Sequence, residues 1–163
     1  MAQEIERKFL VDKVPKNLVV HPYILIDQGY LDLPENHITS QELRIRKSIF
    51  KDGRDEFFLA IKSEGGLSRD EAQIEIPYEA YIALFSLTEG RRVAKTRYLI
   101  PYAHKEIELD VYVGHLEGLV VAEVEFDGVE DSRAFVPPAW FGKEVTEDKS
   151  YKNKNLAVKK PKE

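Results

Sequence analysis

The sequence predicts a mainly β fold, an antiparallel array of about eight strands with a few helices, in one domain spanning residues 1–163. Most of the chain alternates apolar and polar residues with the period of two that is typical of strands. Turn-favouring residues interrupt this alternation at short intervals, as they do in successive hairpins. The chain is long enough for a sizeable core, and no stretch has the composition of a linker.

Five strands are predicted in the first half of the chain, each bounded by residues that favour turns. They span residues 4–11, 23–33, 41–50, 55–63 and 69–77. Turns are predicted at Pro34-Glu35-Asn36 and Lys51-Asp52-Gly53, and the EGGLS stretch at residues 64–68 is expected to connect a hairpin. Pro77 cannot donate to a ladder, so the fifth strand ends there.

After Pro77 the periodicity changes to that of a helix. Tyr81, Leu84, Phe85 and Thr88 recur at helical intervals, which predicts a helix over residues 78–90 that ends at Gly90. Three further strands are predicted at residues 92–100, 102–112 and 118–128. A short helix is expected from about residue 131 to the Pro137-Pro138 pair, and a last helix is expected to begin at Thr146 as its N-cap.

Ionised side chains gather on one face of the predicted strands. On the third strand, Arg44 and Arg46 alternate with Leu43 and Ile45, which therefore lie on the opposite face. Similar same-sign pairs, two residues apart, occur at Glu4 and Glu6, at Lys95 and Arg97, and at Glu123 and Glu125. Like charges on one face repel each other, and solubility does not require them.

Two interpretations of this face remain open at this point. The ordinary one is a solvated face, because antiparallel sheets commonly bury one side and expose the other. The other is a closed barrel with a charged interior, since an eight-stranded barrel can hold one small ligand. Buried charges must be paired or solvated, so such an interior would have to contain water, metal or a polyanion.

Composition excludes several classes of function. A formal net charge of −5 argues against a duplex nucleic-acid partner bound through a basic surface. There is no apolar run of about 18 residues, as a membrane helix requires, and no secretory signal is evident. The absence of cysteine removes disulfides and thiolate sites, and the four histidines lack metal-site spacing. We therefore expect a cytoplasmic protein with no nucleic-acid and no membrane partner.

The two signs of charge together suit a metal-bound chain of phosphates. Arginine matches phosphate oxygens bidentately, and lysine acts as a compact point charge. Carboxylates are hard ligands, and Mg²⁺ prefers a few of them together with water and substrate phosphate oxygens. The candidate phosphate-binding residues are Lys8, Arg44, Arg46, Lys62, Lys95 and Arg97, and the candidate ligands are Glu4, Glu6, Glu71, Glu123 and Glu125.

With these residues in place, the sequence resembles the CYTH superfamily, also called triphosphate tunnel metalloenzymes. The Glu-x-Glu-x-Lys hallmark of that family corresponds to residues 4–8. Further motifs follow in order: QGYL at 28–31, LRIRK at 43–47, IKSEGGLSR at 61–69, EGRRVAKTRY at 89–98, ELD at 108–110, EVEF at 123–126 and FGKEVTEDKSYKNKNLA at 141–157. The chain is most similar to short, single-domain bacterial members, several of which act on inorganic tripolyphosphate.

The resemblance implies an eight-stranded antiparallel tunnel with the C-terminal helix near one mouth. It implies that Mg²⁺ or Mn²⁺ is held by Glu4, Glu6, Glu123 and Glu125, and that Lys8, Arg44, Arg46, Lys62, Lys95 and Arg97 grip the phosphates. It further implies that Glu71 and Asp110 assist a second metal or the attacking water, that Lys149 or Lys152 reaches in from the final helix, and that Tyr30 lines the tunnel. The chain departs from the family at Gln73, where Glu is common; Glu75 follows on the same face.

The expected function is metal-dependent hydrolysis of inorganic tripolyphosphate to pyrophosphate and phosphate, without a covalent nucleophile. The alternatives within the superfamily are a class IV adenylate cyclase, which tends to carry a histidine–phenylalanine element absent here, and a thiamine or nucleoside triphosphatase. Outside it are a non-catalytic polyphosphate-binding module and an all-β scaffold with a solvated charged face. The oligomeric state, including a homodimer, stays open.

Overall fold

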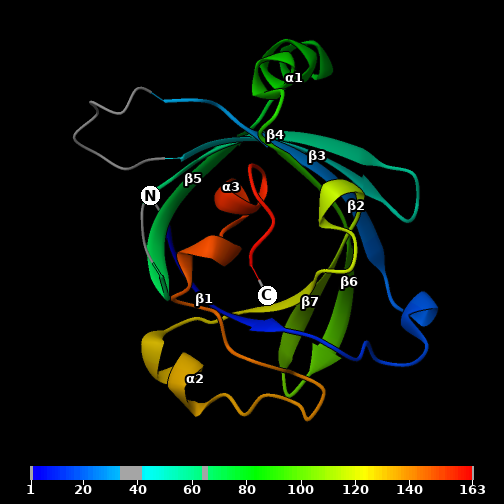
Figure 1. The fold of residues 1–163 in the computed structure, drawn as a ribbon, viewed down its shortest axis with the longest axis vertical. Coiled ribbons are helices and arrows are strands. Elements are labelled where there is room, and N and C mark those ends of the chain that lie inside the picture. The colour runs from blue at the N-terminus through cyan, green and yellow to red at the C-terminus, as the bar shows by residue number, and fades with distance from the viewer. Residues whose placement is uncertain (1, 34–41, 64–65, 163) are drawn as a thin grey trace.

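The computed structural model describes residues 2–33, 42–63 and 66–162, whose strands form one closed antiparallel barrel (Figure 1). These strands are β1 Ala2–Leu10, β2 Tyr23–Tyr30, β3 Glu42–Phe50, β4 Asp55–Lys62, β5 Ser68–Glu75, β6 Arg92–Tyr102, β7 Lys105–Tyr112 and β8 Val120–Glu125. Their order around the barrel is β1-β5-β4-β3-β2-β6-β7-β8. The mainly β class and the eight antiparallel strands are therefore confirmed. The predicted turn at Pro34-Glu35-Asn36 and the first two residues of EGGLS lie outside the described residues.

The first strand closes the barrel because it pairs on both of its edges. Residues 2–5 of β1 pair with β5, and residues 6–10 pair with β8, both antiparallel. Closure removes the unpaired edges that would otherwise expose backbone donors and acceptors. It also gives the sheet a true interior, so that one parity of side chains must point inward and the other outward.

Short helices pack against the outer face of the barrel. α1 Tyr78–Phe85, continued by the 3-10 turn η2 Ser86–Thr88, packs through Tyr81 against Ile45 and Phe57 of β3 and β4. α2 Val129–Ala134 begins two residues before its predicted start. None of the helices in the described residues has the length and apolar character needed to cross a membrane.

The predicted C-terminal helix is confirmed, but its predicted start at Thr146 is wrong, because this segment forms two short helical turns. They are the 3-10 turn η4 Lys149–Tyr151 and α3 Asn153–Leu156, separated by Lys152 in an extended conformation. The Thr146 hydroxyl does not cap a helix, because it accepts a hydrogen bond from the backbone N–H of Lys8 at 3.1 Å. The N-cap is Asp148, whose carboxylate accepts from the backbone N–H of Ser150 at 3.0 Å.

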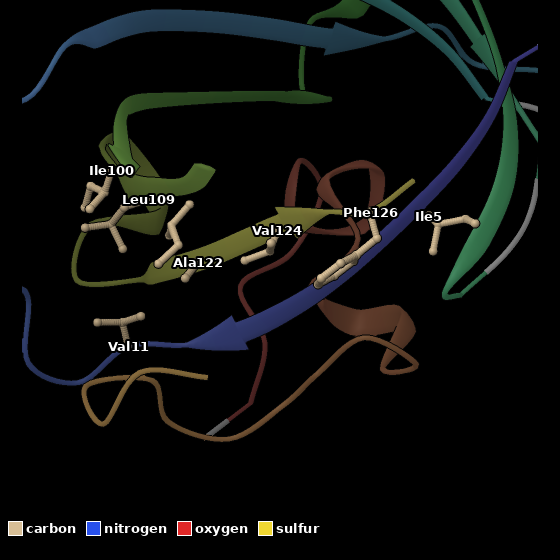
Figure 2. Close-up of a cluster of buried hydrophobic side chains, with 8 residues drawn as sticks. Ile5, Val11, Ile100, Leu109, Ala122, Val124 and Phe126 are labelled. Atoms are coloured by element: carbon tan, nitrogen blue, oxygen red, sulfur yellow. The ribbon is translucent and has the colours of Figure 1, made fainter. Parts of the chain in front are cut away.

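The outward face of β1, β6, β7 and β8 carries the main hydrophobic core (Figure 2). Ile107, Leu109, Ala122 and Val124 are completely buried there. Side chains from α2 and the segment after it cover this face: Val129, Phe135, Trp140 and Phe141. Because the apolar parity is buried on the outside, the charged parity points into the barrel, and the solvated-face interpretation is wrong.

A second apolar cluster occupies the barrel interior beside the C-terminal segment. α3 lies within the ring of strands (Figure 1), and its Leu156 packs with Tyr112, Leu116 and Val121. The hydroxyl of Tyr112 donates to Asn153 Oδ1 at 2.5 Å, which fastens α3 to β7. The described C-terminal segment thus packs against the ends of these strands and contributes Lys152 and Asn153 to the lining of the interior cavity.

Candidate active site

A cavity of about 370 Å³ lies inside the barrel, within the range of about 300–1,000 Å³ typical of small-ligand sites. Its described lining contains seven basic and seven acidic residues. They are Lys8, Arg44, Arg46, Lys62, Arg69, Arg97 and Lys152, with Glu4, Glu6, Glu42, Glu71, Glu108, Glu123 and Glu125. The charged face predicted from parity therefore lines a cavity inside the barrel.

Strand register brings the two acid pairs of β1 and β8 together. Glu6 lies opposite Glu125, and Lys8 lies opposite Glu123. Lys8 Nζ is 3.4 Å from Glu123 Oε1 and also donates to the backbone carbonyl of Tyr151 at 3.2 Å. Glu123 is buried, whereas Glu125 is exposed on the wall of the same cavity. Glu6 and Lys8 are thus held against β8 by backbone pairing, whereas Glu4 lies opposite Arg69 of β5.

On the other side of β1, strands β5, β4 and β3 place cations beside Glu4 and Glu71. Lys62 Nζ lies 3.1 Å from a carboxylate oxygen of each of these residues. Arg44 Nη2 is 3.5 Å from Glu71 Oε1, and Arg44 Nε is buried with no hydrogen-bond partner. A buried donor without a partner carries a desolvation penalty, which an anionic ligand in the cavity would relieve.

Three charged lining residues were not predicted as site residues: Glu42, Arg69 and Glu108. Arg69 Nε is 3.1 Å from Glu4 Oε2, and Arg69 Nη1 is 3.4 Å from Glu42 Oε1. Glu108 Oε2 is 2.5 Å from Arg97 Nη1. The signal that could have found them is parity, because each lies two residues from a predicted site residue on the same strand.

Lys95 and Asp110 share the inward-facing parity of Arg97, but they are buried and do not line the cavity. Lys95 Nζ donates to Asp110 Oδ2 at 2.6 Å, and Arg97 donates to both Asp110 oxygens at 2.7 and 2.9 Å. Burial alone would raise the pKa of Asp110, but Arg97 and Lys95 outweigh it and lower that pKa. Arg97 lines the cavity, whereas Lys95 and Asp110 do not. Asp110 therefore holds the guanidinium of Arg97 in place through its two hydrogen bonds.

The remaining predicted residues divide between the cavity and the surface. Tyr30 and Lys152 line the cavity, whereas Lys149 is exposed and lies outside its lining. Gln73 also lines the cavity, but Glu75 is exposed and does not.

Burial and neighbouring charges give the carboxylates of β1 opposite behaviour. Burial works to raise the pKa of Glu4, but Lys62 and Arg69 prevail and lower it to about 2. Burial and the adjacent Glu123 raise the pKa of Glu6 to about 7. Glu4 is therefore ionised, with its charge balanced by protein cations, whereas Glu6 would need a further positive charge nearby to stabilise its ionised form.

A divalent cation fits the donor chemistry of this wall. Among the described residues, no three acidic or histidine side chains already converge as a metal site, because Glu4 and Glu123 face lysine and arginine. Glu123 Oε1 is nevertheless buried without a hydrogen bond, and Glu6 lacks a sufficient counter-charge. Carboxylate oxygens are the ligands that Mg²⁺ and Mn²⁺ prefer, so Glu6 and Glu123, flanked by Glu4 and Glu125, are suitable donors.

Comparison with known proteins agrees with the architecture. A family model described as CYTH domain matches residues 2–157. The inorganic triphosphatase of Nitrosomonas europaea is 48% identical and covers 97% of this chain and 99% of the relative. That of Acetivibrio thermocellus is 35% identical and covers 99% and 96% respectively. A crystal structure of an inorganic triphosphatase aligns with a TM-score of 0.69 at 44% identity, covering 99% of both chains. The chain therefore belongs to the CYTH domain family.

Proposed function

We propose that this CYTH protein is a divalent-metal-dependent hydrolase that cleaves inorganic tripolyphosphate into pyrophosphate and phosphate. The observation that carries the proposal is the barrel cavity, where basic side chains from five strands and the C-terminal segment converge among carboxylates. Both curated relatives described above are inorganic triphosphatases.

Substrate phosphates would bind to the cations of the inner wall. Arg44 has a free Nε, and the guanidinium of Arg46 is hydrogen-bonded to the neutral side chain of Gln28. Lys8, Lys62, Arg69 and Arg97 also line the cavity, and Lys152 approaches from the C-terminal segment. Charge-assisted hydrogen bonds from several arginines suit the dense negative charge of a phosphate chain.

Glu6 and Glu123, with Glu4 and Glu125 beside them, would hold Mg²⁺ or Mn²⁺. When bound, such an ion offsets phosphate charge and favours deprotonation of a nearby water. The residues of the chain itself bind and orient the terminal phosphoryl group.

In the reaction, a water oxygen attacks the terminal phosphorus, and the bond from that phosphorus to the bridging oxygen breaks. The bridging oxygen keeps the electron pair and leaves as pyrophosphate, with its charge offset by the surrounding arginine and lysine side chains. We assign the proton acceptor to Glu71, because it lines the cavity between Lys62 and Arg44. Asp110 is enclosed by Lys95 and Arg97 and serves to position them.

Inorganic tripolyphosphate suits the described lining better than a nucleotide. Tyr30 is the single aromatic residue among the described lining residues, and it is 2% exposed. Its hydroxyl accepts a hydrogen bond from Gln28, so it offers little ring surface on which a nucleobase could stack.

The test is release of phosphate, pyrophosphate and cyclic nucleotide from tripolyphosphate, pyrophosphate, ATP and thiamine triphosphate, with and without Mg²⁺ or Mn²⁺. We expect tripolyphosphate to be cleaved fastest, with a strict requirement for metal. Cyclic AMP production would favour the cyclase alternative instead. Metal-independent protection against unfolding by tripolyphosphate, with no phosphate released, would favour a binding module.

A further inference from the structure

Gln28 on β2 is a completely buried polar residue whose amide joins two groups of the cavity wall. Its Oε1 accepts hydrogen bonds from Arg46 Nε at 3.1 Å and from Arg46 Nη2 at 3.0 Å. Its Nε2 donates to the hydroxyl of Tyr30 at 2.8 Å. Arg46 and Tyr30 line the cavity, but Gln28 does not. Gln28 therefore acts on the contents of the cavity only through these two neighbours.

The direction of the amide is determined by the chemistry of its partners. A guanidinium only donates hydrogen bonds, so the amide oxygen must face Arg46 and the amide nitrogen must face Tyr30. The oxygen of Tyr30 is then an acceptor, and its own proton is left to be donated elsewhere. Burial, and secondarily the charge of Glu42, raise the pKa of Tyr30, so the phenol keeps that proton.

Arg46 differs from its basic neighbours in what balances its charge. Arg44 has Glu71 as an ion-pair partner, and Arg97 has Asp110. Among the described residues, the side chain of Arg46 has Gln28 as its hydrogen-bond partner and no carboxylate within ion-pair distance. Burial and the repulsion of Arg44 and Arg97 lower its pKa to about 9. A neutral amide therefore holds this guanidinium in place without cancelling its charge.

We propose that Gln28 is a positioning residue that presents Arg46 as an uncompensated cation, and the Tyr30 hydroxyl as a hydrogen-bond donor, to phosphate oxygens in the cavity. The proposal rests on the proposed function of that cavity. It also gives a physical reason for an amide at this position. A glutamate of the same shape would form an ion pair with Arg46 and accept a hydrogen bond from the Tyr30 hydroxyl. Neither group would then be available to the phosphate oxygens of the substrate.

The main experiment compares Gln28→Glu and Gln28→Met with the wild-type protein in steady-state hydrolysis of tripolyphosphate. Gln28→Glu should raise KM by about tenfold or more, the usual cost of one charged hydrogen bond. Gln28→Met removes both hydrogen bonds without adding a charge, and it should lower kcat/KM by about tenfold. In an Arg46→Ala background, Gln28→Glu should raise KM by a smaller factor than in the wild-type protein, because only the contact with Tyr30 then remains to be altered.

Controls separate positioning from a general loss of stability. Ile100→Ala, on the outer face of β6, also removes buried packing, and it should lower the melting temperature without changing KM. Unchanged KM and kcat in a folded Gln28→Glu variant, or full additivity with Arg46→Ala, would overturn the inference.

A measurement on the wild-type protein covers variants that fail to fold. The side-chain NH₂ protons of Gln28 should exchange slowly with solvent in NMR, since they are buried and one is bonded to Tyr30; rapid exchange would overturn the inference. If the wild-type protein releases no phosphate, the proposed function fails on its own. Calorimetric binding of tripolyphosphate to the wild-type and Gln28→Glu proteins then still tests whether Gln28 keeps Arg46 available: equal affinities would refute it.

Discussion

Replacement of Arg44 by alanine should separate catalysis from folding. In the folded protein, Arg44 is 5% exposed, is 3.5 Å from Glu71, and keeps a buried Nε with no partner. Each hydrogen bond to a charged group contributes about 1.5–3 kcal/mol, so losing two such bonds to phosphate should lower kcat/KM at least about 100-fold. The effect on folding should be small, because Lys62 remains 3.1 Å from Glu71 and an unsatisfied donor is removed.

The assay pairs steady-state hydrolysis of tripolyphosphate with thermal unfolding of the same samples. We expect the free energy of unfolding to change by about 1 kcal/mol or less, which corresponds to roughly 2–4 °C in melting temperature for a chain of this size. Arg54→Ala is the matched control, because that arginine is 60% exposed and pairs with Glu56 outside the cavity lining. A large loss of stability with intact turnover would refute the assignment of Arg44 to the substrate site.

Three further predictions concern stability. Asp110→Asn should lower the free energy of unfolding by about 3–5 kcal/mol in chemical denaturation, because Lys95 and Arg97 would remain buried without their counter-charge; a change below about 1 kcal/mol would contradict this. The pKa of Glu4 is depressed from 4.5 to about 2 in the folded protein, so ionised Glu4 stabilises the fold fully above pH 4.5, and this contribution is lost as the pH falls toward 2. Glu4→Gln should therefore flatten the pH dependence of the free energy of unfolding between pH 4.5 and 2. An unchanged profile would show that Glu4 is not the source of that dependence. His104→Gly in the β6–β7 turn should raise the melting temperature by a few degrees. His104 has a φ of 61°, and the left-handed conformation costs a non-glycine residue about 1–2 kcal/mol. An unchanged melting temperature in a calorimetric scan would mean that the turn is unstrained.

Much of the barrel could be predicted from the sequence, because successive residues of a strand point to opposite faces of the sheet. Alternation placed Arg44 and Arg46 on one side and Ile45 on the other, and the structure has Ile45 packed under α1. The same rule extended by two residues would have added Arg69 and Glu108. The segment after Thr146 failed this kind of reasoning, because its conformation depends on hydrogen bonds to Lys8, far away in the sequence.

The sequence by itself determined the strands, the composition of the charged face and the membership of a family. Only the tertiary structure decided that this face is an interior, that Lys95 and Asp110 are buried away from the cavity lining, and that Lys152 lines the cavity whereas Lys149 does not. It also decided that Gln28 stands between Arg46 and Tyr30. The reason is physical: the side of a strand on which a residue lies follows from a period of two, but depth and pairing follow from barrel closure and register between distant strands.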